Sequence, residues 1–165
     1  MHCKEAHKPS NTGRLAKHCL VNSEIRLQGV IGSPLSLDGL IMPERETLLL
    51  LLSPNSEELT PALAGSLAKP VTLLVPDGTW SQASRLGYKL SRLIGVRPVK
   101  LRADKPSEYR LRAEHHPDGM ATFEAIARAL GVLEGEEVRS VMEKLFRLLV
   151  ERSLQARGSL ASLNI

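Results

Sequence analysis

Blocks of apolar residues alternate with amphipathic stretches along the chain, and this pattern predicts strands that alternate with helices. Residues 71–75 are apolar or β-branched at every position, which is typical of a strand buried on both faces. On periodicity alone the run 47–52 is either a buried strand or a helix fragment, and its short length with the stop signal at 53–55 favours a strand. Residues 24–28 alternate as a strand does. We therefore predict strands at residues 24–28, 47–52, 71–75 and 96–101.

The amphipathic stretches predict helices at residues 14–21, 57–69, 81–90, 122–133 and 136–157. Pro61 is expected to break the second of them, because proline removes a backbone donor from a helix interior. An apolar stripe at helical spacing marks the last helix and consists of Val138, Met142, Leu145, Leu149 and Leu154. Strands that alternate with helices predict an α/β domain with a mainly parallel sheet flanked by helices.

Composition narrows the classes of partner. The chain has 22 Lys and Arg residues against 18 Asp and Glu residues, a net charge of +4. This mild basicity permits a nucleic-acid partner without requiring one. One Trp, two Tyr and two Phe residues are too few for a base-stacking platform of the kind that single-strand binders use.

Cysteine usage and hydropathy indicate a cytoplasmic protein. Cys3 and Cys19 form no CxxC pair, so neither a disulfide framework nor a cysteine-rich zinc site is predicted. No segment resembles a signal peptide, and the apolar run 48–52 is far too short to cross a membrane. We expect a cytoplasmic location, no membrane association and no obligate protein partner.

The turn Asp77-Gly78-Thr79-Trp80 directly follows the strand 71–75 and precedes a predicted helix. Polar groups in such a unit lie at the carboxyl edge of the sheet, where α/β proteins bind ligands. Asp77 is either a ligand-facing group or the N-cap of the helix. Gly78 either lets the backbone approach a ligand or only serves the turn. Trp80 either stacks on a ligand ring or packs in the core.

A second polar segment, residues 9–13, gives a dense turn signal before the helix 14–21. Backbone N–H groups at a helix start suit a carboxylate or phosphate, which Arg14 would pair with. The alternative is an ordinary capped helix with a solvated arginine. Ser10 and Asn11 are likewise either caps or ligand contacts.

A third polar segment contains Tyr109, Arg110 and Arg112. On extended backbone the Arg-x-Arg spacing points both cations to one face, which suits phosphate binding; the alternative is a solvated strand edge. Thr122 is a candidate N-cap of the next helix. Glu124 lies in its first turn, where a carboxylate either stabilises the helix or binds a ligand's amino group.

Two other groupings of polar side chains are set aside. His115, His116 and Asp118 do not make a convincing set of metal ligands, so no metal site is predicted. Ser107 with His115 and Asp118 lacks the glycines of a nucleophile elbow, so a hydrolase triad is not predicted either.

The three polar segments resemble the DTW-domain family in both content and order. The matching motifs are Lys-Pro-Ser-Asn-Thr-Gly-Arg-Leu at 8–15, Asp-Gly-Thr-Trp at 77–80, and Tyr-Arg-Leu-Arg at 109–112 with Thr-Phe-Glu-Ala at 122–125. His2 and Glu5 look like the family's His-x-x-Glu element. Three ordered motifs make chance agreement improbable.

The resemblance implies a tRNA-uridine aminocarboxypropyltransferase with a SPOUT-like knotted α/β fold. In that reaction S-adenosylmethionine donates its 3-amino-3-carboxypropyl group to N3 of a uridine in tRNA, leaving methylthioadenosine. N3 carries a proton, so Asp77 is expected to be the catalytic base or the acceptor of the N3–H bond. No metal is expected, because the sulfonium of the donor is already an activated leaving group.

The resemblance also assigns binding residues. Those expected at the donor are Pro54, Asn55, Asp77, Gly78, Thr79, Trp80, Tyr109, Thr122 and Glu124. Those expected at the tRNA are Ser10, Asn11, Thr12, Gly13, Arg14, Arg110 and Arg112. Pro54 and Asn55 are included by position, because the loop 53–69 is where SPOUT-like proteins shape part of the donor pocket.

The resemblance covers roughly residues 2–133, so we expect a DTW domain at 1–133 and a helical extension at 134–165 that packs on it. Many relatives begin with a further strand and a cysteine-rich segment, which are expected to be missing from this chain. Two other functions stay open: a SPOUT-like RNA methyltransferase, and an RNA-binding module without catalytic activity.

Overall fold

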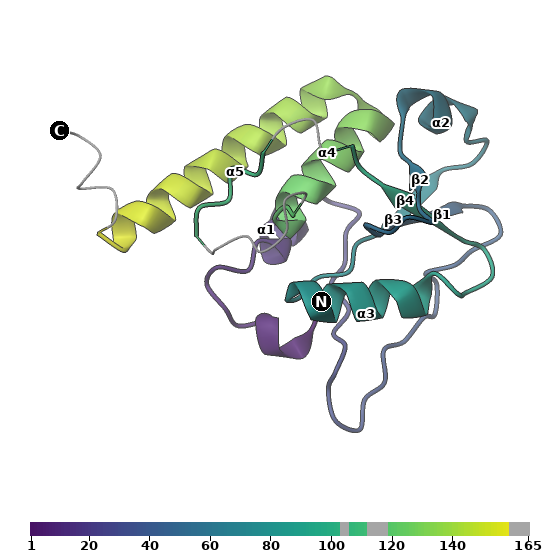
Figure 1. The fold of residues 1–165 in the computed structure, drawn as a ribbon, viewed down its shortest axis with the longest axis horizontal. Coiled ribbons are helices and arrows are strands. Elements are labelled where there is room, and N and C mark those ends of the chain that lie inside the picture. Colours follow the sequence, from purple (N-terminus) through teal and green to yellow (C-terminus); the bar gives the residue numbers. More distant parts are fainter. Residues whose placement is uncertain (103–105, 112–118, 159–165) are drawn as a thin grey trace. The chain divides into compact units, whose positions relative to one another are not determined.

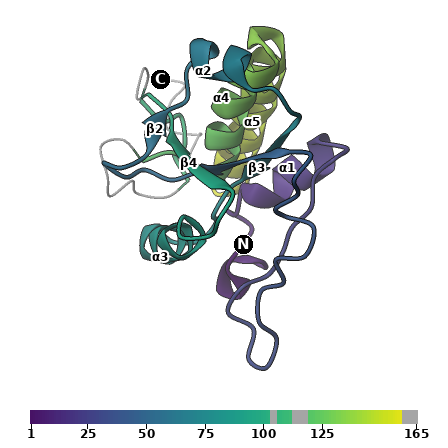
Figure 2. The ribbon, with the colours of Figure 1, turned by 90° about the vertical axis from the view of Figure 1, so that its right-hand side faces the viewer.

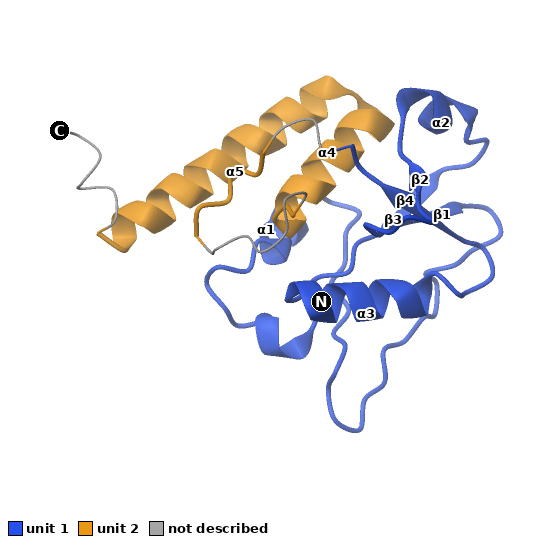
Figure 3. Cartoon of the chain, viewed as in Figure 1, with its two compact units in different colours: residues 1–102 blue, residues 103–165 orange. Residues whose placement is uncertain are grey.

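The structure is a computed structural model that describes residues 1–102, 106–111 and 119–158. The chain divides into two compact units, Met1–Arg102 and Ala103–Ile165, coloured separately in Figure 3. The first unit holds the sheet, and the second holds two long helices. Each unit has its own internal packing and is described by itself.

A parallel sheet forms the centre of the first unit (Figure 1). Among the described residues its strands follow the order β2-β4-β1-β3, and every neighbouring pair is parallel. The bounds are Glu46–Leu50 for β1, Glu57–Glu58 for β2, Val71–Leu74 for β3 and Val96–Lys100 for β4. The prediction of a parallel sheet flanked by helices is confirmed, since the apolar runs become strands with neighbours on the sheet.

Helix α3 (Trp80–Leu90) lies along one face of this sheet (Figure 2). Its buried side packs with Leu49, Leu51 and Leu74 in one apolar cluster. The packing is close at Gly87, where an added Cβ would lie only 2.6 Å from Leu51 Cδ1. The sheet and this helix together fix the turn between β3 and α3.

Three shorter helices complete the first unit: a 3₁₀ helix at Cys3–Glu5, α1 at Gly13–Cys19 and α2 at Pro61–Ser66. The expected break at Pro61 is wrong, because Pro61 is the first residue of α2. Its missing N–H costs nothing at that position, and the Thr60 hydroxyl accepts from the backbone N–H of Leu63. The residues before it, Glu57–Glu58, form the edge strand β2 instead.

The strand expected at residues 24–28 is also absent. Gln28 forms only an isolated parallel bridge with His2. Ile25 and Leu27 are exposed, so the alternating pattern has no sheet to pack against. An alternating sequence needs a neighbouring strand before it becomes a strand itself.

The second unit contains α4 (Thr122–Glu134) and α5 (Glu136–Ala156), joined at Gly135, whose φ is +113°. The two helices pack closely, since a Cβ on Gly131 would lie 2.8 Å from Cβ of Arg139. Met142 of the predicted stripe is buried, but its buried neighbours on α5 are Phe146 and Val150. The stripe was therefore only partly right: burial recurs every four residues from Met142.

None of the helices in the described part of the chain is both long enough and apolar enough to span a membrane.

Candidate functional site

Asp77 follows β3 at the carboxyl edge of the sheet and is only 7% exposed. Asn11 Nδ2 donates to Asp77 Oδ2 at 2.8 Å, across 66 residues of sequence. The Asp77 backbone carbonyl accepts from the N–H of His2, also at 2.8 Å. Two of the sequence motifs, residues 8–15 and 77–80, therefore meet at one carboxylate.

Gly13 lies directly against this carboxylate. A Cβ at Gly13 would lie 3.2 Å from both Cγ and Oδ2 of Asp77. Such a contact is tighter than an ordinary van der Waals contact, so any side chain at this position would push on the carboxylate. The absence of a side chain at Gly13 is what lets the start of α1 approach Asp77.

Asn11 uses both ends of its amide within the first unit. Its Nδ2 reaches Asp77, and its Oδ1 accepts from the backbone N–H of Arg14 at 3.2 Å. Asn11 therefore accepts from a backbone donor in the first turn of α1, whose N-cap is Thr12, and orients Asp77 with the same side chain. Arg14 itself is exposed, whereas Thr12 is buried.

The start of α3 is capped without help from Asp77. The Thr79 hydroxyl accepts from the N–H of Gln82 at 3.4 Å, and Gln82 Oε1 accepts from the N–H of Thr79 at 2.8 Å. This capping box satisfies two donors at the helix end. The interpretation of Asp77 as the helix cap is wrong, because Thr79 is the N-cap.

Trp80 is the first residue of α3 and is 44% exposed. The alternative of a tryptophan packed in the core is therefore wrong. Gly78, two residues earlier, packs closely: a Cβ there would lie 3.0 Å from Gln82 Oε1 and 3.3 Å from Cβ of His2. The turn thus holds Asp77 inside and presents the indole of Trp80 outside.

The first residues of the chain run beside this turn. The Met1 amino group donates to the carbonyl of Arg26 at 2.9 Å, and Cys3 N–H donates to the carbonyl of Gln28, also at 2.9 Å. Burial lowers the pKa of the Met1 amino group, and the negative charge of Asp77 acts against that lowering. The Asp77 charge is therefore felt beyond its hydrogen-bonded partners.

Pro54 and Asn55 are exposed and lie in the loop after β1. Because β1 and β3 are adjacent and parallel, this loop and the Asp77 turn leave the sheet at the same edge. The sheet thus places both segments at its carboxyl end. A contact between Pro54 or Asn55 and a donor stays a prediction.

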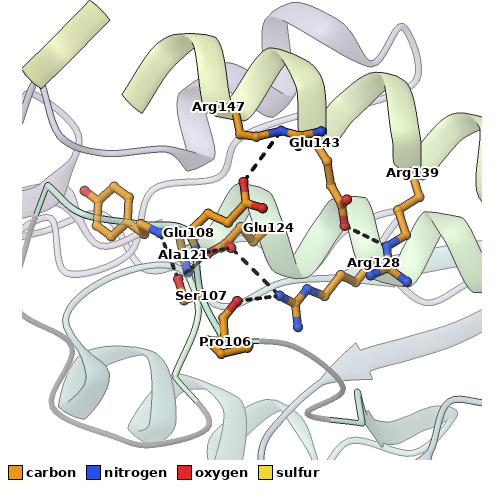
Figure 4. Close-up of polar contacts among 10 residues, drawn as sticks. Pro106, Ser107, Glu108, Ala121, Glu124, Arg128, Arg139, Glu143 and Arg147 are labelled. Atoms are coloured by element: carbon orange, nitrogen blue, oxygen red, sulfur yellow. Dashed lines mark hydrogen bonds and ion pairs between the residues drawn. The ribbon is translucent and has the colours of Figure 1, made fainter. Parts of the chain in front are cut away.

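In the second unit, Glu124 is 4% exposed and accepts three hydrogen bonds (Figure 4). The donors are the Ser107 hydroxyl at 2.5 Å, the Glu108 N–H at 2.8 Å and the Ala121 N–H at 3.1 Å. Glu124 therefore stabilises the first turn of α4 and ties the segment 106–110 to it. These three hydrogen bonds fill most of the carboxylate's roughly four acceptor positions, which leaves about one for a ligand's amino group.

One prediction near this helix needs correction. Thr122 is not the N-cap of α4, because Ala121 occupies that position and Glu124 accepts from its N–H. Ser107, set aside as a nucleophile, is a structural partner of Glu124. The capping signal was readable, since a carboxylate three residues inside a helix start is half of a capping box.

The other residues predicted as site residues in this unit differ in their contacts and exposure. The Tyr109 ring stacks on Phe146, with 6.1 Å between centroids, and Arg110 is exposed. Arg112 lies outside the described residues, as do His115, His116 and Asp118. Within the described ranges, no group of three or more His, Cys, Asp or Glu side chains is arranged to hold a metal ion.

Comparison with known proteins adds a family match to this geometry. A family model described as "DTW domain" matches residues 1–154. The tRNA-uridine aminocarboxypropyltransferase 2 of Drosophila melanogaster is 32% identical over 129 residues, which cover 78% of this chain and 46% of that protein. The proteins of the same name from Macaca fascicularis and Mus musculus are each 33% identical over 107 residues, 64% of this chain and 35% of theirs.

The chain spans less than half the length of these relatives. No solved structure matches it.

Proposed function

The chain belongs to the DTW-domain family, and on this premise we propose that it transfers the 3-amino-3-carboxypropyl group of S-adenosylmethionine to N3 of a uridine in tRNA. The names of its relatives support the reaction class. The observation that carries the assignment to a site is the Asn11–Asp77 hydrogen bond, which joins two family motifs at one buried carboxylate.

In the proposed reaction Asp77 accepts the N3 proton of the uridine. The freed electron pair of N3 forms a bond to the terminal methylene carbon of the donor's aminocarboxypropyl group. The bond from that carbon to the sulfonium sulfur breaks, and its electron pair stays on sulfur in neutral methylthioadenosine. The scheme uses no metal, because the positive sulfonium already makes the sulfur a good leaving group.

Asn11 and Gly13 support Asp77 in this scheme. The amide of Asn11 fixes the carboxylate plane, and Gly13 gives it room. A base held in one orientation needs no rearrangement when the substrate arrives. Asn11, expected at first to contact tRNA, is thus proposed as a positioning residue.

Trp80 is proposed as a wall of the site, because its exposed indole lies three residues after Asp77 and can stack on a uracil or adenine ring. The exposed guanidinium groups of Arg14 and Arg110 are proposed to bind phosphate or the donor's carboxylate, with Arg112 in the same role. The remaining predicted contacts are, at the donor, Pro54, Asn55, Gly78, Thr79, Tyr109, Thr122 and Glu124, and, at the tRNA, Ser10, Thr12 and Gly13.

The proposal extends to three properties inferred from the family resemblance. They are the SPOUT-like knotted path of the chain, a cytoplasmic location, and a division into a DTW domain at 1–133 and a helical extension at 134–165. The parallel sheet is consistent with the first of these.

The test is incubation of the 165-residue chain with bulk tRNA and S-adenosylmethionine, followed by mass spectrometry of the nucleosides and the spent donor. Aminocarboxypropyluridine with methylthioadenosine is expected; S-adenosylhomocysteine would instead indicate methyl transfer. Asp77→Asn should abolish transfer, whereas Asp38→Asn, in an exposed loop, should not. If Asp77→Asn transfers as fast as the unaltered chain, the role of Asp77 is wrong.

A further inference from the structure

The positive charge of the chain is concentrated in one segment. Residues 78–102 contain no Asp or Glu and six cations: Arg85, Lys89, Arg92, Arg97, Lys100 and Arg102. The other 140 residues carry 16 Lys and Arg against 18 Asp and Glu, a net charge of −2. The mild basicity of the whole chain therefore hides a strongly cationic stretch that begins right after Asp77.

Helix α3 carries two of these six cations, Arg85 and Lys89, on one face. Arg85 follows Ser81 by four residues, and Tyr88 and Lys89 follow Arg85 by three and four, which keeps them on the same side of the helix; Arg92 lies in the turn just after the helix ends at Leu90. Arg85, Arg92 and the adjacent Lys89 are exposed, and Tyr88 is 47% exposed. The opposite side of α3 is buried on the sheet.

The cations of this face have no carboxylate partner within the described part of the chain. Arg85 donates only to the Ser81 hydroxyl, at 2.7 Å, on its own helix. Some cations elsewhere do have carboxylate partners: Arg97 lies 2.7 Å from Glu57, and Arg139 on α5 lies 2.7 Å from Glu143. The charge of α3 is therefore available to an external anion.

The chemistry of this face combines unpaired cations with an exposed ring, which is the combination that binds phosphates and stacks on bases. From Trp80 to Leu90 the helical rise is about 15 Å, which is enough to run beside about four phosphates of a stacked strand. An acidic protein surface would satisfy the cations but gives no reason for the aromatic rings.

We propose that the exposed face of α3, defined by Arg85, Tyr88 and Lys89, together with Arg92 in the turn that follows the helix, binds the backbone and bases of the RNA substrate. The helix begins at Trp80, three residues after Asp77, so a strand bound along it would bring a nucleotide to the carboxylate. The choice of tRNA as the partner rests on the proposed function; the binding face rests on charge and exposure.

The test measures tRNA affinity by fluorescence anisotropy at several salt concentrations, without donor. Lys89→Gln/Arg92→Gln should weaken binding about tenfold or more and reduce the slope of log affinity against log salt by about 2. The control Lys144→Gln/Arg152→Gln removes the same charge from exposed positions of α5 and should bind as the unaltered chain does. Equal losses in both double variants would overturn the proposal.

The tRNA affinities of Tyr88 variants test the proposal independently of the charge substitutions. Tyr88→Leu should weaken tRNA binding about fivefold or more, and Tyr88→Phe should not, because the phenyl ring still stacks. If Tyr88→Leu binds tRNA with unchanged affinity, the proposal that Tyr88 stacks on a base is wrong. A duplex DNA that competes as well as tRNA would overturn the assignment to RNA.

Transfer activity is measured in parallel, so that the two proposals can fail separately. If the chain binds tRNA through α3 but releases no methylthioadenosine, the proposed reaction is wrong and the proposed binding face still stands. If the Lys89→Gln/Arg92→Gln variant transfers normally and its affinity for tRNA is unchanged, the proposed binding face is wrong and the proposed reaction still stands.

Discussion

Asn11 Nδ2 and Asp77 Oδ2 lie 2.8 Å apart, although 66 residues separate them in the sequence. The hydrogen bond connects the start of α1 to the turn that follows β3. It holds a nearly buried carboxylate in one orientation at the sheet edge. Its presence makes the orientation of the Asp77 carboxylate depend on a residue of another motif.

Asn11→Asp should therefore change the pH dependence of transfer. A second carboxylate within hydrogen-bond distance raises the pKa of one member of the pair, because like charges disfavour joint ionisation. A base with a raised pKa is deprotonated only at higher pH, so the acidic limb of the pH–rate profile should move upward by about one pH unit or more. The same change at exposed Asn22 should leave the profile in place.

Gly13→Ala should reduce transfer more than it reduces stability. The new methyl group would lie 3.2 Å from the Asp77 carboxylate and displace it, with an expected loss in kcat of about tenfold or more. Gly65→Ala, in α2 with no neighbouring atom within 4 Å, is the matched control and should keep full activity. Equal kcat values for the two variants would contradict the close-approach role of Gly13.

Gly87→Ala should destabilise the first unit. Its Cβ would lie 2.6 Å from Leu51 Cδ1 in the cluster beneath α3, and such overpacking costs about 1–3 kcal/mol. Urea unfolding measures the loss of unfolding free energy. Adding Leu51→Val removes the clashing methyl and should restore part of the loss; no restoration would argue against this contact as the cause.

Glu124→Ala should loosen the segment 106–110 and destabilise the start of α4. Three donors lose their acceptor, and each hydrogen bond to a charged group contributes about 1.5–3 kcal/mol. Trypsin cleavage at Arg110 should accelerate, while Glu137→Ala, at an exposed position of α5, should leave the cleavage rate unchanged. Unchanged cleavage in Glu124→Ala would contradict the proposed tie.

The sequence located the strands in residues 71–75 and 47–52 well, because both carry their signal locally as continuous apolar runs. It overstated the burial of the first, since β3 lies at the edge of the sheet and only its Leu74 is buried. It missed β2, whose two exposed glutamates have no apolar pattern and pair only because β4 lies beside them. It also misjudged residues 24–28, where an alternating pattern found no neighbouring strand. Tertiary neighbours decide such cases.

In the candidate site, too, features with a local sequence signal could be predicted and features that depend on tertiary contacts could not. Asp77 and Trp80 could be placed at a sheet edge from the turn alone, since the strand before them was clear. Thr79 and Asp77 are both good N-caps, so only the geometry shows that Thr79 is the one used. The Asn11–Asp77 contact has no local signature, because a hydrogen bond across 66 residues depends on how the chain folds between them.

The capping box of α3 separates what the chain needs for folding from what it needs for chemistry. Thr79 and Gln82 secure the helix end, so the helix does not depend on the carboxylate just before it. A lineage that replaced Asp77 would lose the proposed proton acceptor and still keep α3 with its cations. A single substitution would thus remove the proposed transfer while leaving the proposed RNA-binding helix in place.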